Sequence, residues 1–162
     1  MTRPSGAGAA WRGRFAGIFQ VLAVKLTPDI PAKKDEVGGA EEMSIGRMEE
    51  WQGRLGLDDW RISLHDCVPA AEMGEENSAG FVEFQEVNKT ARIQIQDPDD
   101  YGERVIPFDY ERILVHELLH LKLCLIAETF GEDPMRERVA HQLIDDLARA
   151  LVDAKRSGVE YE

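Results

Sequence analysis

The residues best suited to chemistry form the motif His116-Glu117-Leu118-Leu119-His120, which lies in a long apolar segment. On a helix, side chains four residues apart project from the same face, so His116 and His120 can both reach one metal ion. The glutamate between them would lie beside the metal, where it can take a proton from an activated water molecule. The HExxH spacing therefore predicts a Zn²⁺ site with Glu117 as the general base.

A catalytic zinc ion needs a third protein ligand and one open position, so the following helix must supply another donor. Glu137 and His141 are the two candidates on that helix. At about 100° of rotation per residue, its apolar face is centred near Leu147. Glu137 falls within that face and in the first helical turn, whereas His141 lies at the edge of the face. We therefore expect His116, His120 and Glu137 to be the metal ligands.

His141 lies one turn after Glu137 and has two candidate roles. It could orient Glu137 or stabilise the oxyanion that forms when a carbonyl is attacked, and for this reason we group it with Glu117 as a catalytic residue. Alternatively, His141 is itself the third ligand, with Asp145 one turn later as its hydrogen-bonding partner. Both Glu137 and His141 could also be ordinary surface residues. On the first assignment, zinc stoichiometry should fall with Glu137→Ala and survive His141→Ala.

Apolar periodicity around the motif predicts the elements that must position it. The predicted helices are Ser44–Leu55, Tyr110 to about Thr129 and Met135 to Lys155, and the predicted strands are Trp60–His65, Gly80–Val87 and Ala91–Gln96. The motif helix is apolar nearly all round, which is typical of a helix buried in the middle of a domain. We therefore expect an α+β fold with an N-terminal helix, a three-stranded, mainly antiparallel sheet, a central HExxH helix and a C-terminal ligand helix.

Local sequence signals mark the starts of two predicted helices. Asp109 before the motif helix and Asp133-Pro134 before the last helix suit helix N-termini.

Two further residues are not expected at the metal site. Cys124 lies one turn beyond His120, further from the metal along the helix axis, so we expect it in the core. His65 falls on the polar side of its predicted strand, and we expect it to face solvent.

Composition restricts the class of protein and its partners. A chain of 162 residues with 43% hydrophobic and 31% charged residues is typical of one globular domain. The net charge of −12 disfavours binding to nucleic acid and favours a neutral or basic polypeptide partner. The sequence contains no run of eighteen apolar residues, so it predicts no membrane-spanning helix. The two cysteines, Cys67 and Cys124, favour a reducing, cytoplasmic setting over a disulfide scaffold.

The N-terminal segment differs in charge from the rest of the chain. Residues 1–42 carry six basic and five acidic side chains, a net charge of +1, which leaves −13 on residues 43–162. The apolar stretch Phe15–Leu26 resembles a targeting segment, but Gln20 interrupts it and no clear cleavage site follows. We therefore expect a domain at 43–162, preceded by a loose or extraneous extension at 1–42.

The order of these elements resembles that of zincin metallopeptidases, and more narrowly that of small gluzincin-like proteins of phages and prophages. The HELLH motif at 116–120 carries most of the resemblance, and the segment Leu57-Asp58-Asp59-Trp60-Arg61-Ile62 before the first strand adds weakly to it. The similar region covers about residues 43–155. In gluzincins an Asp often lies four residues after the ligand glutamate, where this chain has His141. The resemblance implies a small zincin-like domain and zinc-dependent hydrolysis of peptide bonds.

The resemblance also implies how the site would work. His116, His120 and Glu137 would hold Zn²⁺, and Glu117 would accept a proton from water and deliver it to the leaving amine. The alternative is a zinc-stabilised binding or structural module without turnover. A purely structural site needs no base, so the presence of Glu117 favours catalysis.

A polypeptide substrate would need a strand to pair with and a group to stabilise the oxyanion. We expect Ala91–Gln96 to be the edge strand along which an extended peptide pairs. Tyr101 or Tyr110 could lend a hydroxyl to the oxyanion, although simple packing is the commoner role of a tyrosine.

Overall fold

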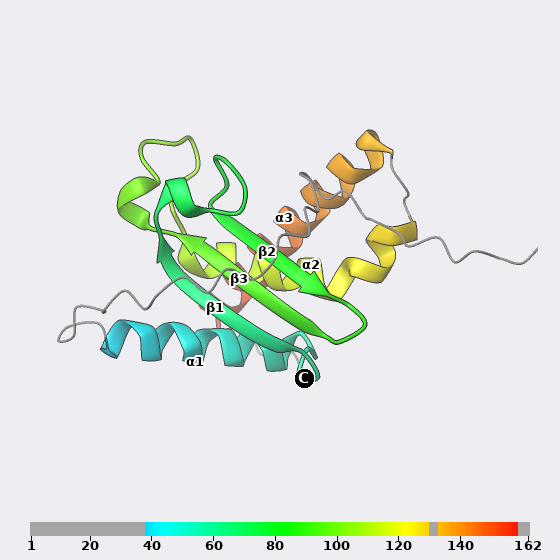
Figure 1. Cartoon of the computed structure of the whole chain (residues 1–162), viewed down its shortest axis with the longest axis horizontal. Coiled ribbons are helices and arrows are strands. Elements are labelled where there is room, and N and C mark those ends of the chain that lie inside the picture. The colour runs from blue at the N-terminus through cyan, green and yellow to red at the C-terminus, as the bar shows by residue number, and fades with distance from the viewer. Residues whose placement is uncertain (1–37, 130–132, 159–162) are drawn as a thin grey trace, which may run out of the picture.

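The computed structural model describes residues 38–129 and 133–158, which fold into three helices and a three-stranded sheet (Figure 1). The helices are α1 (Gly38–Arg54), α2 (Tyr110–Thr129) and α3 (Pro134–Arg156), and the strands are β1 (Arg61–Val68), β2 (Gly80–Gln85) and β3 (Thr90–Gln96). The predicted α+β class is confirmed. In this part of the chain, no helix has the length and apolar character needed to cross a membrane.

The sheet is mixed, so the expectation of a mainly antiparallel sheet is wrong. Its order is β1-β3-β2, and the central strand β3 runs parallel to β1 and antiparallel to β2. Successive strands alternate in direction along the chain, as a hairpin pattern predicts. The hairpin, however, places β3 between β1 and β2, so the two strands that run the same way become neighbours. Periodicity in the sequence does not reveal this spatial order.

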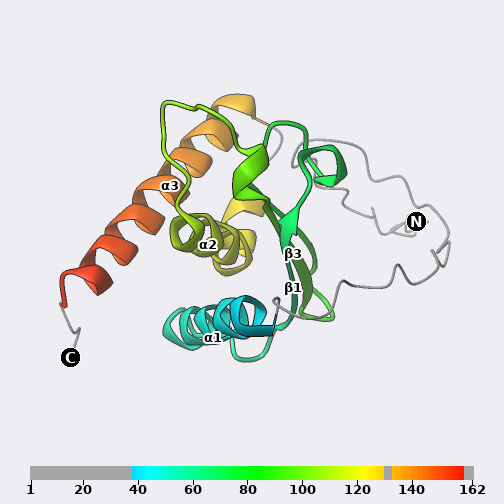
Figure 2. The same ribbon diagram turned by 90° about the vertical axis from the view of Figure 1, so that its left-hand side faces the viewer.

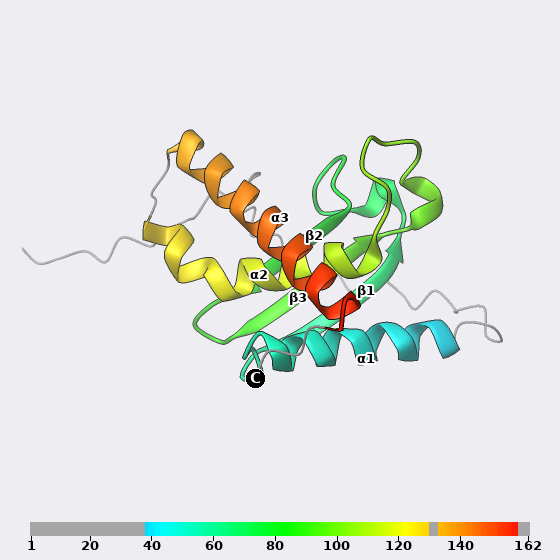
Figure 3. The same cartoon turned by 180° about the vertical axis from the view of Figure 1, so that it is seen from behind.

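One face of the sheet forms the core, and the helices lie on that side of it (Figure 2). Ile93 and Ile95 of β3 are fully buried, as are Leu114, Val115 and Leu118 of α2. Seen from behind, α3 runs across α2 on the side away from the sheet (Figure 3). Because α2 lies between the sheet and α3, nearly every side of it is covered. This arrangement explains the all-round apolar sequence of the motif helix.

The predicted starts of α2 and α3 are confirmed. Asp109 Oδ1 accepts a hydrogen bond from the backbone N–H of Arg112 at 3.3 Å, at the start of α2. Asp133 accepts a hydrogen bond from the backbone N–H of Met135 at 2.9 Å, and Pro134 occupies the first position of α3. These carboxylates satisfy backbone donors that a first helical turn leaves unpaired, and they interact favourably with the positive end of the helix dipole.

Helix α1 begins earlier than its periodicity predicts. The apolar pattern indicated a start at Ser44, whereas the helix begins at Gly38. The boundary that we predicted between residues 42 and 43 therefore falls inside α1. Residues 1–37, which contain the apolar stretch Phe15–Leu26, lie outside the described residues.

Charged side chains join the C-terminal end of α3 to α1 and to the first turn of α2. Lys155 Nζ lies 2.7 Å from carboxylate oxygens of both Glu50 and Glu111. The Arg156 guanidinium donates two hydrogen bonds of 2.8 Å to Asp109. We call this group the ion network; it comprises Glu50, Asp109, Glu111, Arg112, Asp153, Lys155 and Arg156. It holds α3 across α2 and thereby sets where the rest of α3 meets the motif helix.

Candidate metal centre

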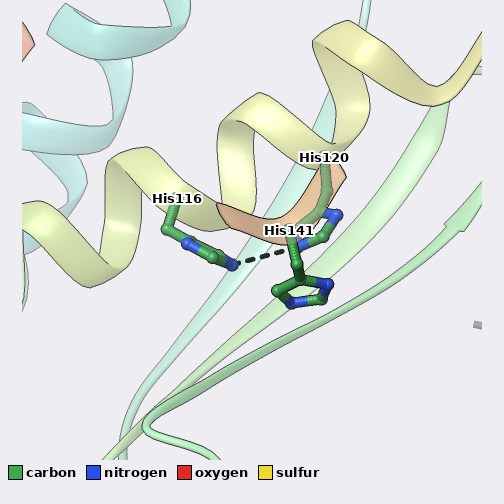
Figure 4. Close-up of side chains that lie close together, drawn as sticks. All are labelled: His116, His120 and His141. Carbon is green, nitrogen blue, oxygen red and sulfur yellow. Dashed lines mark hydrogen bonds between the residues drawn. The ribbon is translucent and has the colours of Figure 1, made fainter. Parts of the chain in front are cut away.

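Three histidines from two helices, α2 and α3, lie close together (Figure 4). His116 and His120 project from α2, and His141 projects from α3. One ring nitrogen from each lies within 4.8 Å of the others, and the Nε2 atoms of His116 and His120 are 3.1 Å apart. Such a group of imidazole nitrogens could hold one metal ion. We call these residues the histidine group.

The spacing of His116 and His120 on α2 accounts for two members of this group. They are four residues apart, so their rings lie on one face with centroids 4.9 Å apart. Leu118 and Leu119, between them, are buried in the core and fix the rotation of α2 about its axis. The two histidines therefore point away from the sheet, toward α3.

His141, rather than Glu137, completes the group on α3. Its ring centroid lies 5.3 Å from that of His116 and 4.8 Å from that of His120. Glu137, the ligand that we preferred from the sequence, lies one turn earlier and is not among the three residues brought together; its side chain is partly exposed, whereas that of His141 is exposed. The structure thus brings together the alternative ligand set of the sequence interpretation.

The reason lies in which part of α3 packs against the rest of the molecule. The apolar residues Met135, Val139 and Leu143 in its first half are 63%, 58% and 51% exposed. The buried contacts come instead from Ile144 and Ala148, together with Val152 nearer the C-terminus. When all apolar residues of α3 are counted equally, the centre of the apolar face therefore differs from the centre of the face that packs against α2. The face defined by the buried residues includes both His141 and Glu137, but only His141 lies next to the buried part of α3, one turn before Ile144 and Asp145.

Asp145 is the hydrogen-bonding partner of His116. Its Oδ1 lies 2.8 Å from His116 Nδ1, although from the sequence we had paired Asp145 with His141. A carboxylate at this nitrogen favours the tautomer that carries the proton on Nδ1 and leaves the Nε2 lone pair available. Nε2 is the atom that faces His120. Asp145 therefore orients His116 for metal binding.

Burial keeps the motif histidines neutral. Burial, followed by the neighbouring His116 and His141, lowers the pKa of His120 to about 3. Burial is also the largest cause of the lowered pKa of His116, where the opposing effect of Asp145 is smaller. A metal ion binds only the deprotonated ring nitrogen, so at neutral pH both rings are in the form that a metal requires.

Glu117 is buried beside the histidine group, with only 6% of its surface exposed. Burial, then the negative charges of Glu75 and Asp145, raises the pKa of its carboxyl to about 8. Space for this carboxyl depends on Gly80 at the start of β2. A Cβ atom at residue 80 would lie 2.5 Å from Glu117 Oε1 and 2.6 Å from Ile113 Cγ2. Sequence reasoning missed this contact, and the glycine at the first position of a strand was its only signal.

The two tyrosines considered for the oxyanion have other partners. Tyr101 donates its hydroxyl to the backbone carbonyl of Ile106 at 3.0 Å. Tyr110 donates to Asp66 Oδ1 at 2.7 Å, and burial is the largest cause of its raised pKa. Both hydroxyls therefore take part in hydrogen bonds within the protein.

The residues that we had separated from the metal site lie where we expected them. Cys124 is buried in the hydrophobic core, and His65 is exposed on β1 beside Ser63. By contrast, the expectation that Ala91–Gln96 forms an edge strand is wrong, because β3 is the centre of the sheet. β1 and β2 are the outer strands.

Comparison with known protein families, with curated proteins and with solved structures finds no match for this chain. The resemblance to zincin metallopeptidases therefore stays a prediction that rests on the motif. What the geometry adds is the meeting of His116, His120 and His141 beside a buried Glu117.

Proposed function

We propose that this protein is a zinc-dependent peptidase whose metal ligands are His116, His120 and His141. The proposal rests on the convergence of three imidazole nitrogens, together with the buried carboxyl group of Glu117, which lies between His116 and His120 in the motif. Three nitrogen donors with one position left for water are a known ligand set of catalytic zinc. A carboxylate on the second nitrogen of one ligand, here Asp145 on His116, is also common at zinc sites. The donor set therefore fits zinc.

Glu117 would act as the general base. Bound zinc would polarise the scissile carbonyl and lower the pKa of the attacking water. Glu117 would take the proton of that water and pass it to the leaving amine. With a pKa of about 8, its carboxyl is mostly protonated at pH 7 without metal. A nearby cation favours the charged carboxylate, so metal binding would convert Glu117 into a base.

The edge of β2 is the best position for an extended peptide substrate. β3 is paired on both sides, whereas β2 is an outer strand of the sheet. At the first residue of β2, Gly80, the missing side chain leaves the space in which the Glu117 carboxyl lies. A peptide that adds to the outer edge of β2 would therefore pass close to the proposed base.

A zinc-stabilised module without turnover is the second candidate. The histidine group links α2 to α3, so a metal there would hold the two helices together even without catalysis. Such a role has no need of a buried carboxyl at residue 117, whose burial has a free-energy cost. The presence of Glu117 favours the peptidase.

Two measurements on the same protein samples test the proposed function. The first is zinc content by elemental analysis, and the second is hydrolysis of a denatured protein mixture. We expect one zinc ion per chain and a loss of hydrolysis of about 10²-fold or more in Glu117→Gln, with zinc retained. His65→Ala is the matched control, because this exposed histidine lies outside the histidine group. Equal hydrolysis by wild type and Glu117→Gln, or none by wild type, would contradict the peptidase.

A further inference from the structure

The first position of β2 has no side chain on the face of the strand that packs against the core. Side chains on a strand alternate between its two faces, so residue 80 lies on the same face as Val82 and Phe84. Both of those residues pack against the hydrophobic core. A side chain at residue 80 would therefore point toward α2, but the residue is Gly80. Glycine in a strand costs stability and often marks a place where another group approaches closely.

The approaching groups come from two successive turns of α2. A Cβ atom at residue 80 would lie 2.5 Å from Glu117 Oε1, 3.0 Å from Glu117 Cγ and 2.6 Å from Ile113 Cγ2. Real Cβ atoms essentially never have neighbours closer than 3.0 Å. The Glu117 side chain therefore occupies the volume that a side chain at residue 80 would need.

The backbone on both sides of this contact is fixed. Gly80 pairs with Ile95 of β3, which is fully buried, and the carbonyl of Ala79 accepts a hydrogen bond of 2.9 Å from the backbone N–H of Gln96. On α2, Leu118 is fully buried in the core. Neither β2 nor α2 can move away at low cost, so a larger residue at position 80 would have to displace a side chain.

Of the two side chains near residue 80, Glu117 is the one that can move. Ile113 is branched at Cβ, so its Cγ2 stays close to the helix backbone. By contrast, Oε1 is at the far end of the flexible Glu117 side chain. Glu117 lies about 60° around the helix from His120, on the side where Gly80 meets α2. Gly80→Ala would therefore move the Glu117 carboxyl and leave the histidine group in place.

We propose that Gly80 is a positioning residue for the proposed base, because the space that it leaves fixes the place of the Glu117 carboxyl between β2 and the histidine face of α2. This inference rests on the proposed peptidase function. One residue would then set both the start of the edge along which a peptide pairs and the position of the group that takes the proton from water. A misplacement of about 1 Å in such a group can cost about 10²-fold in rate.

The first experiment measures peptide hydrolysis by four zinc-loaded, full-length proteins, namely wild type, Gly80→Ala, Glu117→Gln and the double variant. We expect Gly80→Ala to lower kcat by about 10²-fold, with little change in KM and with zinc retained. Adding Gly80→Ala to Glu117→Gln should cause little further loss, because both substitutions act on the same base. Gly46→Ala is the matched control and should leave kcat unchanged, since a Cβ atom at residue 46 meets nothing within 4 Å.

A second experiment measures stability without metal and without substrate. The urea midpoint is compared with and without Gly80→Ala, once in wild type and once in Glu117→Ala. We expect Gly80→Ala to lower the midpoint in wild type and to lower it less once the carboxyl is removed. Gly80→Ala that folds only together with Glu117→Ala would support the inference equally. If this coupling is found but wild type hydrolyses no peptide, then Gly80 places the Glu117 carboxyl and the peptidase proposal fails.

Two results would overturn the role of Gly80. One is a kcat for Gly80→Ala equal to that of wild type and Gly46→Ala. The other is a loss of kcat in Gly80→Ala that multiplies with the loss in Glu117→Gln, which would show that the glycine serves only the fold. In both cases, hydrolysis by wild type that depends on Glu117 leaves the peptidase proposal standing.

Discussion

The ion network and the histidine group both join α2 to α3, yet their ionisable side chains have different surroundings. In the ion network, carboxylates face cations. Hydrogen bonds from Arg156 are the largest cause of the lowered pKa of Asp109. For Glu111, burial alone would raise the pKa, but hydrogen bonds from Lys155 and Trp51 outweigh it and the pKa is lowered. The ionised forms of Asp109 and Glu111 therefore stabilise the folded protein.

At His116, Glu117 and His120, further along α2, burial dominates. It lowers the pKa values of His116 and His120 and raises that of Glu117. The charges that act on Glu117, from Glu75 and Asp145, are negative and add to the effect of burial. Groups held in such unfavourable surroundings are typical of functional sites. One part of the α2–α3 contact therefore stabilises the fold, whereas the other is held in place at a cost in stability.

The same substitution, Glu to Gln, at two positions of α2 should change the free energy of unfolding in opposite directions. This is the largest effect that we predict. In the metal-free protein, Glu117→Gln should raise the free energy of unfolding, whereas Glu111→Gln should lower it. The Glu117 carboxyl has a folded-state pKa of about 8, above its ordinary 4.5. Its contribution to stability is present below pH 4.5 and is lost as pH rises through 8. The gain in Glu117→Gln should reach the order of a few kcal/mol at about pH 9.

Urea denaturation of the metal-free proteins at acidic and alkaline pH measures this contrast. Glu111→Gln should cost about 1–3 kcal/mol at neutral pH, because Lys155 and Arg156 lose a charged acceptor. Unchanged or reduced stability of Glu117→Gln at alkaline pH would show that Glu117 is not the unfavourably buried group described above.

Removing the partner of His116 should have the next largest effect. Asp145→Asn keeps the shape of the side chain but weakens the hydrogen bond to His116 Nδ1. We expect zinc affinity to fall by about 10- to 100-fold, the usual result of losing such a partner. Competition with a chelator of known affinity measures it. Asp146→Asn, a substitution at an exposed neighbouring residue, serves as the control, and an equal loss in both variants would argue against a specific role of Asp145.

Acid should weaken the ion network by a smaller amount. The pKa values of Asp109 and Glu111 are lowered from 3.8 and 4.5, so their stabilisation is present above those values and is lost as pH falls below them. Arg156→Met should cost about 1 kcal/mol at neutral pH, and this difference from wild type should shrink in acid. Urea denaturation at about pH 7 and about pH 3.5 measures the change. A difference that is the same at both pH values would mean that Arg156 contributes through packing alone.

Helix α2 could be predicted from the sequence because its signals are local. Asp109 marks its start, the apolar residues mark its length, and the four-residue spacing of His116 and His120 sets them on one face. The order of the strands could not be predicted, since the pairing of β1 with β3 joins segments that are distant in the sequence. The expected edge strand was therefore assigned to β3 instead of to an outer strand.

The choice between Glu137 and His141 depended on packing that a helical wheel cannot show. Both lie near the apolar face of α3, and the sequence does not reveal that Met135 and Val139 remain exposed. The space that Gly80 leaves for the Glu117 carboxyl likewise depends on how the loop before β2 meets α2. The residue types of this loop suggested only a polar connection.

Zinc content of purified, metal-reconstituted protein shows whether His116, His120 and His141 hold the metal. We predict one zinc ion per chain in wild type and in Glu137→Ala, and less than about a tenth of that in His141→Ala, on the order expected when one of three ligands is lost. If zinc were retained in His141→Ala and lost in Glu137→Ala, Glu137 would be the third ligand; wild type without stoichiometric zinc would mean that the histidine group is not a zinc site.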